Sequence, residues 1–326
     1  MRRIGLGLFI IGITFAKAYA QEDYGPVNTG AANYLTVPAD ARSAAMGGAG
    51  VAAPGGDHAV FHNGAAALSD VTRRGGVAYT YSPWMRDYES GYSLHSLGGF
   101  YKINQRNAIL LGFRYFGYPE MDGTGEDASG IHPKEIAVEA GYAYEVIKNF
   151  SVSATFKYLF SDMGRIGNSR GASSVAFDLG VLYKCGINDW EGAGWSVGFH
   201  ASNLGPKINY LTSKEALPAT VKVGGAADLP FLQMHKLTLT ADLGYRLSPA
   251  DVQALSVSAG AEYAWRELVM LRGGYHCGDK KKGDASYATA GAGVEYAGVR
   301  LDFAWLFAGH EYLARNTFWV SLGYSF

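Results

Sequence analysis

Two glycine-rich stretches have spacings that could carry chemistry. Residues 48–53 (GAGVAA) are similar to the turn that holds a dinucleotide phosphate at a helix N-terminus. Residues 167–171 (GNSRG) match the nucleophile elbow G-x-S-x-G, which needs a strand before it and a helix after it. No apolar strand precedes the first stretch, and a strand pattern follows the second. The sequence therefore predicts no cofactor and no serine nucleophile.

Histidine and cysteine residues offer a second set of candidates. His58 and His62 have the spacing of two metal ligands on one helix face, but Asp57 is their one acidic neighbour. We therefore interpret both histidines as packing residues and predict no metal site. Cys185 and Cys277 are expected at opposite ends of the β structure described below, so we expect two free thiols. With no catalytic residues at hand, the protein is predicted not to be an enzyme.

The composition restricts the class of protein. The chain of 326 residues has 44 glycines, 22 tyrosines and 16 phenylalanines, and only 17% of its residues are charged. An average soluble domain has about 25% charged residues. A formal net charge of −1 lacks the excess of basic residues that nucleic-acid binding requires. This balance also excludes a disordered chain or a coiled coil and favours an all-β protein.

The first twenty residues have the features of a secretory signal peptide. Arg2 and Arg3 precede an apolar run over residues 4–15, and residues 18–20 (AYA) form a small-x-small cleavage site. We expect cleavage after Ala20. Twelve apolar residues are too few for a membrane-spanning helix, which needs about 20.

After residue 75 apolar and small or polar residues alternate, which is typical of β-strands with two unlike faces. Within residues 135–146, for example, Ile136, Val138 and Tyr142 share one parity, and Glu135 and Glu139 share the other. Fourteen such segments are expected, near residues 75–82, 92–101, 108–118, 135–146, 151–161, 173–183, 194–202, 219–227, 236–246, 254–264, 268–275, 287–297, 299–308 and 317–326.

Charged residues in these segments all fall on the small-residue parity. Seven are basic and eight are acidic: Arg114, Lys157, Lys222, Lys236, Arg246, Arg272 and Arg300, with Glu135, Glu139, Glu145, Asp178, Asp242, Glu262, Glu295 and Asp302. Since glycine, alanine and serine share that parity, it suits a crowded barrel interior. The near balance of charge predicts ion pairing inside the barrel.

Strand length and connections favour a transmembrane barrel. Most segments have about ten residues, within the range of about 9–11 that a tilted membrane-spanning strand needs. Long and short connections alternate, as in outer-membrane barrels, and the chain ends on Phe326 after an aromatic-rich strand. We expect an antiparallel β-barrel of about 14 strands at residues 75–326 in the bacterial outer membrane. Residues 21–74 do not alternate and are predicted to form an N-terminal plug in the lumen.

Several motifs, in shared order, resemble the PorV/PorQ family of FadL-related outer-membrane barrels. Residues 38–52 (PADARSAAMGGAGVA) include Asp40, Arg42 and Met46 and resemble the start of that family, P-D-A-R-x-x-x-M-G-x-A-G-V-A. Residues 81–86, 114–116, 161–163, 202–210 and 316–317 resemble its PorV-type member. One departure is that the family's N-P-A reads Asn63-Gly64-Ala65 here, so the plug lacks the fixed proline φ.

The resemblance implies a plugged barrel that serves the type IX secretion system of Bacteroidetes. PorV-type proteins are non-enzymatic shuttles that dock beside a large translocon barrel, accept cargo by its C-terminal signal domain and pass it to the surface attachment complex. External loops on a rigid barrel are suited to such binding. The partner contacts we expect there are Trp84, Met85 and Arg86 in the first loop and Asp162, Met163 and Arg165 in the third. Trp84 could equally belong to the aromatic girdle at the membrane surface.

Alternatives remain open. A FadL-like channel for hydrophobic small molecules would need an apolar pocket at the plug and a lateral opening, of which the sequence has no clear sign. Outer-membrane lipid surrounds any such barrel, and residues 280–282 (KKK) in a loop could contact lipopolysaccharide. Neither nucleic acid nor a cofactor is expected as a partner.

Overall fold

A computed structural model describes residues 30–53, 56–70, 72–87, 90–120, 130–163, 171–188, 190–210, 213–310 and 312–326. The expected signal peptide (residues 1–20), the beginning of the expected plug (residues 21–29) and Arg165 lie outside these residues.

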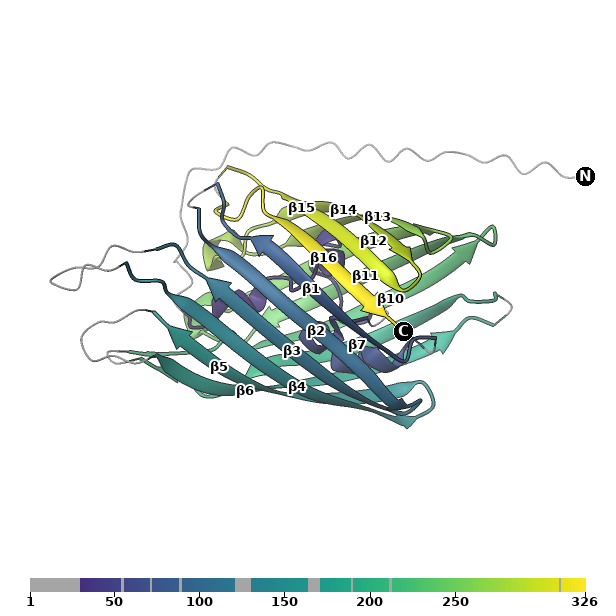
Figure 1. Ribbon diagram of the computed structural model, residues 1–326, viewed down its shortest axis with the longest axis horizontal. Helices are drawn as coiled ribbons and strands as arrows, with labels where there is room; N and C mark the ends of the chain where they lie inside the picture. Colours follow the sequence, from purple (N-terminus) through teal and green to yellow (C-terminus); the bar gives the residue numbers. More distant parts are fainter. Residues whose placement is uncertain are drawn as a thin grey trace, which may run out of the picture.

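In the described part of the chain, fourteen antiparallel strands close into a barrel (Figure 1). They are β1 (Gly75–Pro83), β2 (Ser93–Asn104), β3 (Asn107–Gly117), β4 (Lys134–Ile147), β5 (Phe150–Asp162), β6 (Ala172–Gly186), β7 (Gly194–Leu204), β10 (Thr220–Phe231), β11 (His235–Arg246), β12 (Leu255–Trp265), β13 (Val269–Cys277), β14 (Tyr287–Tyr296), β15 (Val299–Phe307) and β16 (Phe318–Ser325). The first and last strands pair in register from Gly76 with Ser325 to Tyr81 with Val320. The expectation of a closed fourteen-stranded barrel is confirmed.

Alternation of residue type produces the two faces of the barrel wall. In β5 the inward-facing Thr155 and Lys157 are buried, and the outward-facing Phe156 and Tyr158 are exposed. Large apolar and aromatic side chains facing outward suit a lipid environment. No described helix is long and apolar enough to cross a membrane.

The two ends of the barrel differ in the length of their connections. At the turn end, Ala297 and Gly298 both have positive φ angles and join Tyr296 to Val299 in a two-residue turn. At the other end, here called the loop end, the connections are longer and comprise residues 84–92, 118–133, 163–171, 205–219, 247–254, 278–286 and 308–317. Cys185 lies near the turn end of β6 and Cys277 at the loop end of β13; both are free thiols, as expected.

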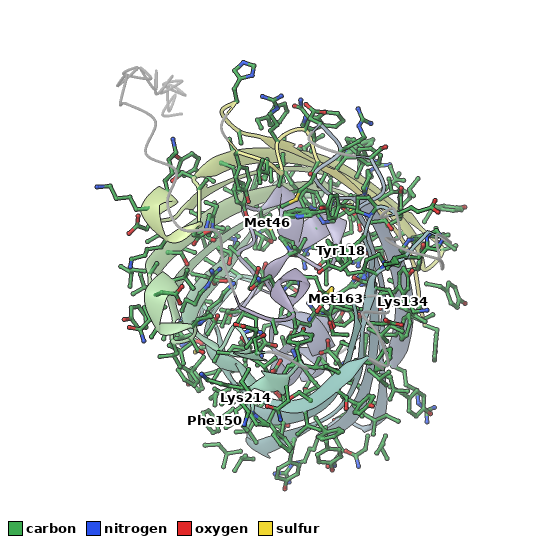
Figure 2. All side chains as sticks on the ribbon, turned by 90° about the vertical axis from the view of Figure 1, so that its left-hand side faces the viewer. Met46, Tyr118, Lys134, Phe150, Met163 and Lys214 are labelled. Atoms are coloured by element: carbon green, nitrogen blue, oxygen red, sulfur yellow. The ribbon has the colours of Figure 1, made fainter. Side chains whose placement is uncertain are left out.

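Residues 30–53 and 56–70, here called the lumenal segment, lie inside the barrel. Figure 2 looks into the barrel from the loop end and shows this segment enclosed by the strands. Its helices are η1 (Asn33–Thr36), α1 (Ala41–Ala45), α2 (Ala59–His62) and η2 (Gly64–Leu68). The helix α1 contacts β13 to β16, whereas α2 and η2 contact strands between β2 and β6. Short 3-10 helices η3 (Ala250–Val252) and η4 (Lys280–Lys282) lie in loop-end connections.

Candidate functional site: the lumenal segment and the loop end

Asp40 begins the helix α1 and connects it to α2. Its Oδ1 accepts a hydrogen bond from the backbone N–H of Ser43 at 2.8 Å, which is a helix N-cap. Its Oδ2 contacts His62 Nε2 at 2.5 Å and Ser43 Oγ at 2.7 Å. Burial by itself raises the pKa of Asp40, but the charge and hydrogen bonds of His62 and the Ser43 hydroxyl together hold that pKa well below its usual range. The Asp40 carboxylate therefore stabilises the contact between the two lumenal helices.

Arg42 and Met46 attach the same helix to the wall. The guanidinium of Arg42 donates two hydrogen bonds to Glu262, from Nε at 2.9 Å and from Nη2 at 2.8 Å. Met46 packs against Gly260 and Gly274, where any Cβ would collide with it. Glycine at these two wall positions therefore permits the lumenal segment to approach the strands.

Asn63 is the N-cap of η2 and also joins that helix to its surroundings. Its Oδ1 accepts from Ala65 N at 3.2 Å, and its Nδ2 donates to the backbone oxygens of Val51 at 2.8 Å and Val181 at 3.0 Å. Gly64 is the first residue of η2, a position that proline also suits. If another residue replaced Gly64, its Cβ would lie only 3.0 Å from Ser153 Oγ. The Asn63 amide therefore maintains the turn in which the family has a proline.

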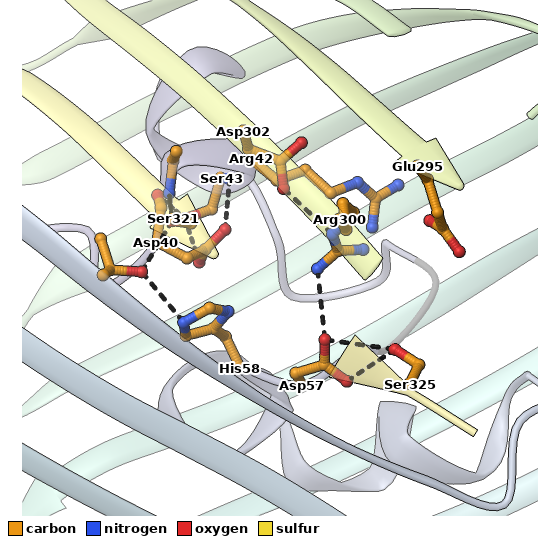
Figure 3. A network of polar contacts seen from close by, with 12 residues as sticks. Asp40, Arg42, Ser43, Asp57, His58, Glu295, Arg300, Asp302, Ser321 and Ser325 are labelled. Carbon is orange, nitrogen blue, oxygen red and sulfur yellow. Dashed lines mark hydrogen bonds and ion pairs between the residues drawn. The ribbon is translucent and has the colours of Figure 1, made fainter. Parts of the chain in front are cut away.

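Ion pairs form a continuous chain from the lumenal segment into the wall and back, and Figure 3 shows its part from Asp57 through Arg300 to Asp302. We call it the first charge chain, and it runs Asp57, Arg300, Asp302, Arg272, Glu262, Arg42. Its shortest contact joins Arg272 Nε to Glu262 Oε2 at 2.6 Å, and its longest joins Arg300 Nη2 to Asp57 Oδ2 at 3.6 Å. Both ends belong to the lumenal segment, so the chain attaches that segment to the wall at two points.

A second charge chain crosses the opposite side of the lumen and consists of Arg114, Glu139, Lys157 and Asp178 on β3 to β6. Arg114 Nε lies 3.1 Å from Glu139 Oε1, and Lys157 Nζ lies 3.5 Å from Glu139 Oε2 and 2.7 Å from Asp178 Oδ2. All four side chains are buried. The prediction that charges inside the barrel pair with one another is confirmed for the members of these two charge chains.

His58 and His62 line a small cavity inside the lumen. Its volume is about 40 Å³, and its lining includes Asp40, Arg42 and Arg300. Burial lowers the pKa of His58 to about 4, against the opposing effect of Asp40, and its Nε2 lies 3.1 Å from Thr80 Oγ1. Among the described residues, no three His, Cys, Asp or Glu side chains are placed so that they could hold a metal ion.

Apolar side chains fill the lumen near the loop end. Tyr34 and Leu35 of the lumenal segment pack in one buried cluster with Ile208, Leu217 and Trp319. Tyr34 stacks on Phe116 with ring centroids 5.9 Å apart. Two of these residues, Ile208 and Leu217, come from the connection between β7 and β10, and Ile208 belongs to the motif at residues 202–210.

The expected contact residues of the first loop are held against the last strand. Trp84 is half-buried, and its ring meets that of Trp319 edge-on at 6.1 Å. Met85 has a positive φ of 53°. Arg86 is exposed, with its guanidinium 5.9 Å from the centre of the Phe318 ring. Trp84 therefore packs into the loop-end cluster, whereas Arg86 remains accessible to solvent.

The expected contacts of the third loop lie apart from these. Asp162 is the last residue of β5, opposite Lys134 of β4, and Met163 follows with 40% of its surface exposed. Three strands, β2 to β4, separate β5 from β1. Arg165 is outside the described residues. The two sets share the loop end but do not form one compact site.

The basic run in the connection between β13 and β14 forms the 3-10 helix η4. Asp279 caps it by accepting from Lys281 N at 2.9 Å, and Lys282 Nζ donates to the backbone oxygen of Asp251 at 2.9 Å. Contact with lipopolysaccharide at these lysines stays a prediction.

Ser258, His276 and Asp284 form a hydrogen-bonded series that matches none of the motifs in the sequence. Ser258 Oγ lies 2.9 Å from His276 Nδ1, and His276 Nε2 lies 2.9 Å from Asp284 Oδ1. A serine hydrolase needs donors where its oxyanion develops. Here Ser258 is buried, and the residue directly opposite it on β11 is Asp242. The Asp242 carboxylate accepts hydrogen bonds and cannot donate one to an oxyanion. We therefore interpret these hydrogen bonds as attaching the connection at residues 278–286 to β12 and β13, and not as the machinery of acyl transfer.

Comparisons with known structures identify the fold. The toluene transporter TbuX of Ralstonia pickettii is 13% identical, with 88% of this chain and 97% of that chain covered and a TM-score of 0.58. The toluene transporter TodX of P. putida is also 13% identical, with 89% and 98% covered and a TM-score of 0.58. A Pseudomonas aeruginosa FadL homologue is 13% identical, with 88% and 98% covered and a TM-score of 0.50. At these identities the likeness shows the fold alone.

Sequence comparison identifies the family. No curated protein matches the chain. The family described as type IX secretion system protein PorV matches residues 19–253, which is more than half of the chain. Together with the barrel, this match indicates an outer-membrane protein. The chain belongs to the PorV family of type IX secretion system proteins.

Proposed function

We propose that this protein is a non-enzymatic outer-membrane component of type IX secretion. In this role it docks at the translocon barrel, accepts secreted cargo by its C-terminal signal domain and delivers it to the surface attachment complex. The proposal rests on the observation that the lumenal segment fills the inside of the barrel. The lumenal segment is attached by the first charge chain on one side and contacts the second on the other. Cargo would therefore bind to the outside of the barrel.

The loop end is the surface where we expect cargo or the translocon to bind. Long connections on a rigid barrel can vary in sequence without disturbing the strands. Arg86 and Met163 are the most accessible of the expected contacts that the structure describes. Trp84 would act indirectly, because its packing on Trp319 supports the loop that carries Arg86.

Affinity purification from native membranes tests the proposal. The tagged protein should recover a large translocon barrel or proteins with a type IX C-terminal signal domain. The variant Arg86→Glu should recover less of either, because it reverses a charge at the loop end. Arg266→Glu is the matched control, since Arg266 is an exposed arginine at the turn end. Recovery of neither partner by the unmodified protein would contradict the proposal.

The rival function is a FadL-like channel for hydrophobic small molecules, and the fold likeness to toluene transporters is what favours it. The internal cavity argues against it. An apolar cavity of about 150 Å³ binds benzene. The cavity here measures about 40 Å³ and is lined by charged groups of Asp40 and Arg42. Bound fatty acid or aromatic hydrocarbon in solvent extracts of the purified protein, without any type IX partner, would favour the channel.

The expected leader belongs to the same proposal. Export to the outer membrane requires removal of residues 1–20, so the mature protein should begin at Gln21. Intact-mass measurement of the protein from outer membranes checks this start. A mass that includes residues 1–20 would contradict it.

A further inference from the structure

The described part of the connection between β7 and β10, residues 205–210 and 213–219, folds inward over the loop end; we call it the mouth loop. Its short strands β8 (Ile208–Asn209) and β9 (Lys214–Glu215) pair with each other. Ile208 is 0% exposed. The backbone N–H of Ala31 in the lumenal segment donates to Ala216 O at 3.0 Å. The mouth loop therefore covers the lumenal segment instead of extending into solvent.

Asn203 joins the mouth loop to the second charge chain. Its backbone N–H donates to Asp178 Oδ1 at 2.8 Å, and its Oδ1 accepts from Lys157 Nζ at 3.0 Å. Its Nδ2 donates at 3.2 Å to the backbone oxygen of Pro218, near the far end of the mouth loop. Asn203 itself has a φ of 58°, in the left-handed region that asparagine tolerates better than most residues. One buried side chain thus connects both ends of the loop to buried charges.

The opposite end of the second charge chain contacts the lumenal segment. Arg114 Nη1 donates to Leu35 O at 3.2 Å, and its guanidinium lies 4.4 Å from the centre of the Phe61 ring. Arg114 is 2% exposed, as is the carboxylate of Asp178 at the other end. A continuous set of buried contacts therefore leads from the lumenal segment, through Glu139 and Lys157, to the mouth loop.

We infer that the second charge chain keeps the mouth loop closed on the lumenal segment. Asn203 is the positioning residue, because its side chain connects Lys157 of the charge chain to Pro218 of the mouth loop. The physical reason is that the chain alternates in charge without access to water. Removing any one member leaves a buried partner uncompensated, so the contacts form or break together. The loop is thus a lid whose closure depends on charges as distant as Arg114. This inference goes beyond the proposed secretion role and does not require it.

Cysteine labelling of the purified protein tests the inference. Ile208→Cys is introduced into a chain that also carries Cys185→Ser and Cys277→Ser, and its rate of reaction with a hydrophilic maleimide is measured. Ser213→Cys, on the exposed part of the same loop, serves as the reference. We expect Ile208→Cys to react at least tenfold more slowly than Ser213→Cys. Equal rates would mean that the loop is open and would overturn the inference.

Three variants then test the role of the chain. Asn203→Gly permits the same backbone angle but removes the side-chain hydrogen bonds, and we expect it to raise the Ile208→Cys rate at least tenfold. Lys157→Met and Arg114→Met should do the same. Lys157→Met tests the link to Asn203 directly, whereas Arg114→Met tests the far end of the chain, because Arg114 bonds to Glu139 and Leu35 and to none of the described residues of the mouth loop. Lys236→Met, which removes an exposed ion pair with Glu267, should leave the rate unchanged.

Heat-modifiable gel migration shows which variants form a barrel. If Lys157→Met does not fold, Asn203→Gly and Arg114→Met carry the test, since Asn203→Gly leaves the ion pairs of Lys157 intact. An unchanged rate in Asn203→Gly would mean that backbone conformation alone closes the loop. An unchanged rate in folded Arg114→Met would mean that closure is local to Asn203. Either result would overturn the inference.

Discussion

Glu262 occupies the most heavily bonded position of the first charge chain, and its replacement by glutamine has a calculable consequence. Its carboxylate accepts two hydrogen bonds from Arg42 and one, at 2.6 Å, from Arg272. Glutamine keeps the shape but places an amide group, which donates, opposite guanidinium groups that also donate. The variant Glu262→Gln therefore leaves the buried Arg272 and the half-buried Arg42 facing each other with one negative charge fewer.

The expected loss of stability follows from burial. Removing one partner of a buried ion pair costs about 3–5 kcal/mol, because the remaining charge is uncompensated. Glu262 is 5% exposed and Arg272 is also 5% exposed, so this range applies to their pair. The exposed pair of Lys236 and Glu267, with its nitrogen and oxygen 3.1 Å apart, provides the contrast. Glu267→Gln should cost about 0–1 kcal/mol.

Urea unfolding in lipid vesicles, followed by tryptophan fluorescence, measures both free energies of unfolding. A double-mutant cycle that combines Glu262→Gln with Arg42→Met measures the interaction between Arg42 of the lumenal segment and Glu262 of the wall. We expect a coupling free energy of about 2 kcal/mol between these two residues. A loss for Glu262→Gln no larger than that for Glu267→Gln would refute the reasoning. So would a coupling near zero, because Arg42 would then contribute nothing through Glu262.

Three further predictions concern glycine, histidine and cysteine. Gly260→Ala should destabilise by about 1–3 kcal/mol in the same urea assay, because the added Cβ collides with the lumenal segment, whereas outward-facing Gly225→Ala should be neutral or slightly stabilising. Burial lowers the pKa of His58 from 6.5 to about 4. Between these two pH values, His58 therefore binds a proton in the unfolded chain but not in the folded chain. Stability should therefore be complete above about pH 6.5 and fall as the pH drops towards 4, and His58→Gln should show a smaller fall; equal pH profiles would contradict this. On intact cells a membrane-impermeant maleimide should label exposed Cys277 at the loop end and spare Cys185 at the turn end; labelling of Cys185 alone would reverse the assigned orientation.

Strand positions were predictable because their signal is local. The expected segment near residues 135–146 corresponds to β4 (Lys134–Ile147), and that near 299–308 corresponds to β15 (Val299–Phe307). Lipid outside and a crowded polar lumen inside select opposite residue types at alternate positions. The same two environments place Glu139 and Lys157 on the inner face, so their burial was also predictable.

Roles inside the lumen were less predictable. The motif with Asp40 and Arg42 was visible, but the partner of Arg42, Glu262, is 220 positions away in the chain. Asn203 was noticed only as part of a motif, although its side chain joins Lys157 and Pro218. Such pairings depend on which strands lie next to each segment in the folded barrel. The spacing of residues along the sequence does not specify these neighbours.

By itself the sequence determined the class of fold, the inward parity of the charges and the family motif, since each depends on residue type and near-neighbour spacing. Only the tertiary structure decided which charges pair, that Asn63 maintains the turn where a proline is absent, and that the mouth loop turns inward. Closing the barrel brings β1 against β16 and places the lumenal segment between distant strands. In that enclosed space a polar group must find its partner within a few ångströms, and the packed structure alone specifies which partner is there.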